Sequence, residues 1–187
     1  MKRILVTACV LLTSTSLWAR SERENLKITP IIGFERVQRF TPTPHMKTRG
    51  IFGVGAVYSL GVGALEAEYT HGQDTSNDVT SNTSYKQSDD KVKLGLRGTA
   101  DLGSFLSTYL RGGAQAKKTE TTSTTATGTS SSSSTTKVNP YVGAGLGFHL
   151  LQFVTLNADV TAVYTPTSTP GLSDYEIQPS LGLSIRF

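Results

Sequence analysis

Residues 174–187 read DYEIQPSLGLSIRF and alternate between apolar and polar positions from end to end. The residues between the apolar ones carry no apolar side chain. A period of two places successive side chains on opposite faces of an extended chain, so this stretch predicts a β-strand with one apolar face. Its fourteen residues exceed the roughly 9 to 11 that a tilted strand needs to cross a bilayer. The apolar positions are Tyr175, Ile177, Pro179, Leu181, Leu183, Ile185 and Phe187.

The composition fits a single domain whose polar positions are mostly small and uncharged. The chain has 187 residues, of which 17% are charged, against about a quarter in ordinary soluble domains. Gly, Ser and Thr are abundant, which is unusual for a surface that faces water. The length accommodates eight strands of membrane-spanning length with their connections, and nothing in the charge distribution indicates a nucleic-acid partner.

The first nineteen residues have the layout of a secretory signal peptide. Lys2 and Arg3 precede an apolar stretch from Ile4 to Leu12, and Ala19 stands before a charged run. We expect cleavage after Ala19, which leaves residues 20–187 as the mature domain. A lipoprotein site at Cys9 is a weaker alternative, because the apolar region before it is short. Cleavage removes the only cysteine and the only tryptophan and lowers the formal net charge from +4 to +2 (16 basic minus 14 acidic residues), so no disulfide is expected.

Eight segments of the chain show the period of two, and long and short connections alternate between them. The segments are 26–35, 51–60, 63–71, 92–100, 106–115, 138–149, 154–164 and 174–187. The long connections are predicted to be loops: 37–49, 72–90, 119–136 and 165–173. In 119–136, fifteen of eighteen residues are Ser or Thr, a composition that predicts a flexible segment. Short turns on one side and long loops on the other are typical of a transmembrane barrel.

The terminal SLGLSIRF and this asymmetry resemble the small eight-stranded bacterial outer-membrane barrels, like the transmembrane domain of outer membrane protein A and the outer membrane protein X type. The resemblance implies an all-β, antiparallel up-and-down transmembrane barrel. It also implies that the protein is a monomer in the outer membrane, with both termini in the periplasm, in contact with membrane lipid and lipopolysaccharide. In such barrels the last strand is the signal read by the insertion machinery; here its residues are Tyr175, Ile177, Leu181, Leu183, Ile185 and Phe187.

Alternation alone also fits a soluble barrel with an apolar interior, so the direction of the two faces needs separate evidence. A solvent face should be dense in Lys and Glu, whereas the polar positions here are largely Gly, Ser, Thr, Tyr and Asn. Small polar residues suit the narrow interior of an eight-stranded barrel. Aromatic residues at both ends of the apolar face also match the girdles of membrane barrels. The polar face is therefore predicted to line the interior.

Five of the charged residues on the predicted interior face lie in the middle or lower part of their strands. Isolated charges in a narrow lumen are costly, so we expect them to pair across the barrel as a structural ion cluster. A conducting pathway is the alternative reading, although eight strands leave little free lumen. The five are Glu66, Glu68, Arg97, Arg111 and Asp159.

No catalytic, cofactor-binding or metal-binding residue is predicted. His45, His71 and His149 fall at different ends of the barrel and predict no shared site. His71 is a formal candidate for lipid A chemistry, but an interfacial or loop histidine is the simpler interpretation. The sequence thus predicts a non-enzymatic barrel that displays mobile surface loops, for envelope integrity or for adhesion to a cell-surface or host ligand. A small porin-like channel and, less favoured, a lipid A-modifying enzyme are the alternatives.

Overall fold

The computed structural model describes residues 26–41, 43–61, 63–78 and 82–187. The predicted signal peptide, residues 1–19, lies outside these ranges. None of the described residues belongs to a helix long and apolar enough to cross a membrane. The strands are β1 (Leu26–Arg39), β2 (His45–Ser59), β3 (Ala64–Asp78), β4 (Thr83–Asp101), β5 (Leu106–Thr125), β6 (Gly128–Ser133), β7 (Lys137–Leu151), β8 (Val154–Tyr164) and β9 (Tyr175–Arg186).

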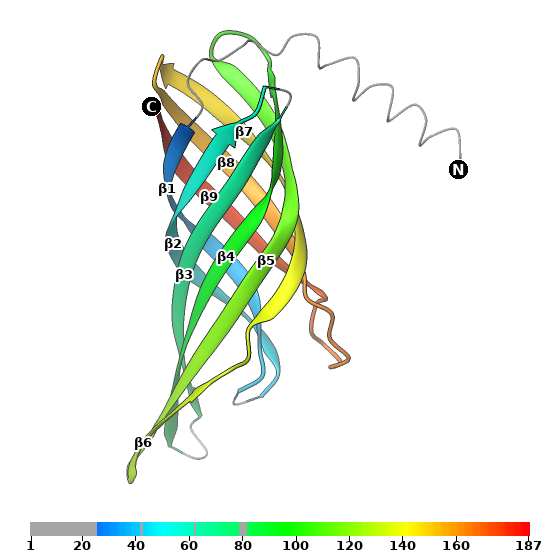
Figure 1. Cartoon of the computed structure of the whole chain (residues 1–187). Coiled ribbons are helices and arrows are strands. Elements are labelled where there is room, and N and C mark those ends of the chain that lie inside the picture. Colours follow the sequence, from blue (N-terminus) through cyan, green and yellow to red (C-terminus); the bar gives the residue numbers. More distant parts are fainter. Residues whose placement is uncertain (1–25, 42, 62, 79–81) are drawn as a thin grey trace, which may run out of the picture.

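Eight of these strands form a closed antiparallel barrel. Each pairs with its neighbour in the chain, β5 pairs with both β4 and β7, and β1 pairs with β9 to close the ring. Strand β6 pairs only with β5 and lies outside the ring. In Figure 1 the strands incline around the barrel axis, and β6 forms the tip farthest from the C-terminus. The predicted eight-stranded up-and-down barrel is confirmed.

The polarity of the barrel is inverted relative to a soluble protein. Ile32 on β1 and Leu96 on β4 are 65% and 64% exposed on the outer surface, whereas Glu35 and Asp89 are fully buried inside. The polar face therefore lines the interior, as predicted. The aromatic residues of both predicted girdles are exposed on the outer surface: Phe52, Tyr69, Tyr164 and Tyr175 towards the long connections, and Tyr58, Phe148 and Phe187 towards the short turns.

Three of the four predicted long loops are wrong in extent, because the strands continue into them as β-hairpins. Strands β1 and β2 pair up to Arg39 and His45, and β3 and β4 pair up to Asp78 and Thr83. The segment predicted to be flexible, 119–136, contains the end of β5 and all of β6. Strand pairing uses backbone groups, so it continues without a regular apolar face. In the β3–β4 and β5–β6 hairpins both faces are largely polar, and the period of two that marks a half-buried strand disappears there.

Glycines on the inner face make room for the largest interior side chains. A Cβ atom on Gly145 of β7 would lie 2.4 Å from the ring of Tyr109, and one on Gly95 of β4 would lie 2.4 Å from the hydroxyl of Tyr141. Both tyrosines are 2% exposed. The two rings therefore lie across the backbone of other strands and fill the interior at these heights.

We expect Gly145→Val to destabilise the barrel, because its side chain would displace the Tyr109 ring from a filled interior. Overpacking of this kind costs roughly 1 to 3 kcal/mol. Gly98→Val is the matched control, since a Cβ atom at Gly98 meets nothing within 4 Å. Urea midpoints of both variants in lipid vesicles test the claim. Equal midpoints would show that the Tyr109 ring can move aside without loss of stability.

Candidate functional site

The interior near the short turns holds an ion cluster centred on Arg111 of β5. Its Nη1 donates to Glu66 Oε1 at 3.0 Å and to Glu68 Oε2 at 2.6 Å, and its Nη2 donates to Asp159 Oδ1 at 2.7 Å. Lys93 of β4 binds the other oxygen of Glu68 at 2.5 Å. The Arg111 and Glu68 side chains are 5% and 3% exposed. Charges from β3, β4, β5 and β8 thus meet inside the barrel.

Arg97 lies at the edge of this cluster rather than at its centre. Its Nη1 is 4.0 Å from Glu66 Oε2, and its guanidinium carbon is 3.4 Å from the centre of the Tyr109 ring. A cation over an aromatic face is attracted by the ring's quadrupole, and the Tyr109 hydroxyl donates to Asp159 Oδ2 at 3.1 Å. All five residues predicted for the interior cluster are therefore close together, with Lys93 as an unpredicted member.

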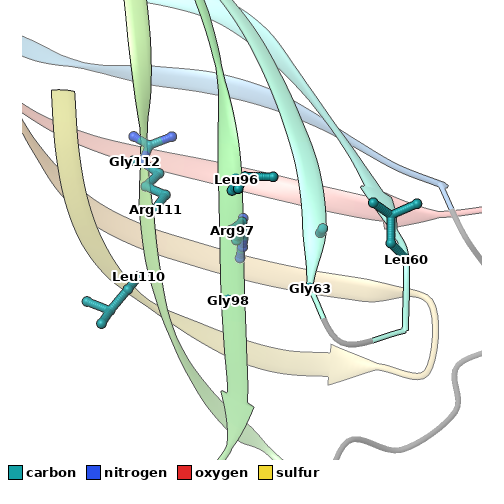
Figure 2. A pocket seen from close by; sticks show the side chains of 9 residues that line it. Leu60, Gly63, Leu96, Arg97, Gly98, Leu110, Arg111 and Gly112 are labelled. Atoms are coloured by element: carbon teal, nitrogen blue, oxygen red, sulfur yellow. The ribbon is translucent and has the colours of Figure 1, made fainter. Parts of the chain in front are cut away.

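Figure 2 shows Arg97 and Arg111 on neighbouring strands beside an apolar hollow near the short turns. The exposed side chains of Leu60, Leu96 and Leu110 surround this hollow. Gly98 and Gly112 also line it. The three leucines point to the outer surface, where lipid chains cover them in a membrane.

A second and larger ion cluster lies inside the half of the barrel that carries the long hairpins. Arg49 of β2 is 2.5 Å from both Glu35 Oε1 and Asp89 Oδ2, and 3.1 Å from Asp74 Oδ2. Arg39 at the end of β1 binds the same Asp74 at 2.6 Å and Asp89 at 3.1 Å. The residues around these pairs are Lys91, which contacts Glu35, and Lys117, which is 2.7 Å from Glu176 Oε1.

This second cluster is not predicted by the sequence pattern, because 37–49 and 72–90 lack the period of two and were expected to be loops. A usable signal was nevertheless present on the neighbouring strands. Lys91 continues the interior positions of β4 beyond Lys93, and Glu176 and Gln178 belong to the polar face of the closing strand. Charges at successive interior positions require partners on other strands, and Arg39, Arg49, Asp74 and Asp89 in the segments 37–49 and 72–90 supply charges for such pairs.

Both clusters balance their own charge. Near the short turns, three acids (Glu66, Glu68, Asp159) meet three bases (Lys93, Arg97, Arg111). Towards the long hairpins, four acids (Glu35, Asp74, Asp89, Glu176) meet four bases (Arg39, Arg49, Lys91, Lys117). Buried charges are tolerated when each is paired and hydrogen-bonded. The described interior is thus crossed by two neutral layers of long side chains.

The three histidines lie apart, as predicted. His71 on β3 is 2.9 Å from Asp90 Oδ1, which also accepts a hydrogen bond from the Tyr69 hydroxyl at 2.6 Å. The His71 ring packs on Phe52 with centroids 5.3 Å apart, so this group belongs to the outer surface. No serine or threonine hydroxyl of the described residues hydrogen-bonds His71, and these residues contain no group of three or more metal-ligating side chains.

The predicted insertion-signal residues of the last strand all face outward. Tyr175, Ile177, Leu181, Leu183 and Ile185 are exposed on β9, and Phe187 follows the strand with 66% exposure. The backbone N–H of Phe187 donates to the carbonyl of Leu26 at 3.0 Å. Phe187 is therefore hydrogen-bonded to the first residue of β1.

Comparisons with known proteins place the fold. The model of the outer membrane protein beta-barrel domain matches residues 5–187, and no curated protein matches the chain. Neisserial surface protein A is similar in structure, with a TM-score of 0.67 and 14% identity over 87% of this chain and 96% of that one. Ail of Yersinia pestis, crystallised with the heparin analogue sucrose octasulfate, has a TM-score of 0.57 and 16% identity, over 87% of this chain and 99% of that one. The N-terminal β-barrel domain of Pseudomonas aeruginosa OprF has a TM-score of 0.51 and 18% identity, over 88% of this chain and 98% of that one.

We expect Arg111→Ala and Glu68→Ala each to lower barrel stability, whereas Lys118→Ala should not. Removing one member of a buried ionic group leaves its partner uncompensated, at a cost of roughly 3 to 5 kcal/mol. Lys118 pairs only with Glu120 on the exposed surface, where a salt bridge contributes about 1 kcal/mol or less. Urea midpoints in lipid vesicles decide the question: small and similar shifts for all three variants would contradict an energetically important interior cluster.

Proposed function

This chain belongs to the outer membrane protein beta-barrel domain family, and from that premise we propose a non-enzymatic surface protein of the bacterial outer membrane. Its barrel would act as a rigid body that holds long hairpins outside the cell, for contact with other surfaces or for envelope integrity. The observation that carries the proposal is the pair of charge-balanced ion clusters, because an interior filled by paired side chains supports a structural body rather than a channel.

The hairpins support a role in surface contact. Beyond the last pairing of β2 with β3 at Ile51 and Gly72, strands β3 and β4 continue to Asp78 and Thr83, and β5 continues with β6 to residue 133. This extension is visible at the bottom of Figure 1. Its polar side chains suit an aqueous space, and transmembrane barrels carry their longer connections outside and their short turns in the periplasm. We therefore place both ends of the mature chain in the periplasm.

Several further assignments accompany this proposal. Residues 1–19 act as a cleaved signal peptide, and the outward-facing positions of β9 with Phe187 present the strand to the insertion machinery. The belt of exposed apolar side chains contacts membrane lipid, and the outer surface of the barrel towards the long hairpins contacts lipopolysaccharide. The closed ladder of β1 with β9 leaves no barrel edge for another copy to pair with, which favours a monomer.

Similar proteins support an external ligand without identifying one. Ail of Yersinia pestis was crystallised with a heparin analogue, and another similar structure is that of a neisserial surface protein. At 16% and 14% identity these similarities concern the fold alone. They make adhesion to a host or cell-surface ligand a reasonable role for the hairpins of this chain.

An enzymatic role in lipid A modification is the weaker alternative. The His71–Asp90 pair lies on the outer surface, but a hydrolase of this type needs a nucleophile within hydrogen-bond reach of the histidine. Among the described residues no hydroxyl hydrogen-bonds His71. Mass spectrometry of lipid A from cells with and without this protein tests the alternative, and we expect identical spectra.

Purified and refolded protein should not conduct ions in a planar bilayer. Conduction requires groups along the pore that can replace the water molecules around an ion. In the two ion clusters the charged groups are already bound to one another and cannot do so. The comparison is Arg111→Ala, which removes the centre of one layer, and we expect brief conducting events from this variant. Steady conductance of the unaltered protein would favour the small-channel alternative.

Deleting Thr119–Ser134 should leave a barrel that still migrates faster on gels unless boiled. The deletion removes β6 and the end of β5, but Lys117 and Lys137 remain paired at the edge of the ring, and shortening a connection changes closure entropy little. Cells that express the deletion variant should lose adhesion to surfaces bound by cells with the full protein. Unchanged adhesion, with both proteins present at the surface in equal amounts, would contradict the role of this hairpin.

A further inference from the structure

A polar pocket of about 530 Å³ opens where the barrel interior ends, above the cluster of Arg49 and Asp89. Its walls come from the interior faces of β4, β5 and β7, and from the residues that follow β1 and β8. The volume lies within the roughly 300 to 1,000 Å³ of pockets that hold small ligands. The residues that line it include Gln87, Lys137, Asn139, Phe40 and Pro166.

Three side chains in this pocket lack a partner. Gln87 on β4 is 6% exposed, yet its amide makes no hydrogen bond with any described residue. The same is true of Asn139, two positions beyond the start of β7, and the Lys137 ammonium has no carboxylate within salt-bridge distance among the described residues. The polar atoms of Gln87 are not enclosed by protein, Asn139 is half-buried, and Lys137 is exposed at the opening. All three therefore face the pocket with donors or acceptors that a ligand or water can satisfy.

The charged groups at the floor of the pocket are already paired with one another, so the groups without a partner are concentrated on one side. Lys117 is held by Glu176 at 2.7 Å and Asp89 at 3.5 Å. The Gln38 amide donates to the carbonyls of Thr165 at 2.7 Å and Ser173 at 2.6 Å. These bonds hold the connection between β8 and β9 beside the opening. A ligand would therefore meet the wall formed by β4, β5 and β7.

The charge of the pocket favours an acidic ligand. The cluster beneath it is neutral, with four acids and four bases. Lys137 stands directly across from Lys117 in the β5–β7 register, so the wall carries one cation that no acid neutralises. A carboxylate or sulfate placed there would gain a charge-assisted hydrogen bond, which is stronger than a neutral one.

The remaining groups favour a sugar. Unpaired amides offer both donors and acceptors, and Thr119 and Thr121 add hydroxyls from β5. Phe40, which is 51% exposed, and Pro166 supply apolar surfaces of the size of a sugar ring's C–H face. We propose that this pocket binds an acidic saccharide, with its carboxylate or sulfate on Lys137 and its hydroxyls on Gln87 and Asn139.

The inference deepens the proposed surface-contact function, on which it rests for access from outside the cell. Two sources present this chemistry: the acidic glycans of another cell, and the acidic core sugars of the bacterium's own lipopolysaccharide. Calorimetric titration of protein in lipid nanodiscs exposes both ends of the barrel, so it tests the pocket independently of orientation and adhesion. The probes are a sulfated heparin disaccharide, a core oligosaccharide released from lipopolysaccharide, and neutral maltose.

Binding of either acidic probe, with maltose binding much more weakly, supports the pocket and identifies its source. Lys137→Gln should raise the dissociation constant about tenfold, the effect of losing one charge-assisted hydrogen bond, and should weaken its dependence on salt. Gln87→Leu keeps the volume of the side chain and should weaken binding by a similar factor. Lys118→Gln is the matched control, because Lys118 is exposed and does not line the pocket.

Each variant must still shift on unboiled gels, which verifies the closed barrel. Failure of the unaltered protein to bind either acidic probe would overturn the inference and leave the adhesion test of the hairpin deletion standing. Equal binding of maltose would contradict the role assigned to Lys137. An effect of Lys118→Gln as large as that of Lys137→Gln would show a general charge effect and would also overturn the site.

Discussion

The closed hydrogen-bond ladder is the constraint on which the rest of this structure depends. In hydrocarbon no water can satisfy a backbone N–H or C=O group, so spanning strands must pair on both sides. Pairing of β1 with β9 meets that requirement with the last strand of the chain. Once the ladder is closed, every strand has one face towards lipid and one towards a narrow interior, and the residues of each face are chosen accordingly.

The narrow interior explains why the charges are arranged in balanced layers. An unpaired ion in such a space loses its hydration without compensation, whereas a paired and hydrogen-bonded one is tolerated. Arg111 binds acids of β3 and β8, and Arg49 binds acids of β1, β3 and β4. Each guanidinium therefore links several strands through the interior. The glycines opposite Tyr109 and Tyr141 serve the same filling, because they admit rings that cross the lumen.

Above the membrane the constraint is different, since water satisfies any group that the ladder leaves free. Strands there need no apolar face, and the Ser and Thr side chains of β5 and β6 bond to one another, as Ser123 does with Ser130 at 2.7 Å. The interior ends in the same region, where Lys137 and Gln87 lie without partners above a charge-balanced cluster. The pocket thus lies where water first reaches the interior and a charged side chain no longer needs an oppositely charged partner.

The sequence by itself determined the number of barrel strands, the direction of their faces and five members of one ion cluster, because the period of two is a local signal wherever one face meets lipid. It did not determine the hairpins or the second cluster, because both faces of the chain are polar there and the period vanishes. Only the tertiary structure decided which charges meet: Lys91 contacts Glu35 from a distance of 56 positions in the chain, and the stagger of the closed strands sets that encounter. The same stagger left Lys137 opposite another lysine and without an acid, since partners in a barrel are chosen by register and not by sequence proximity.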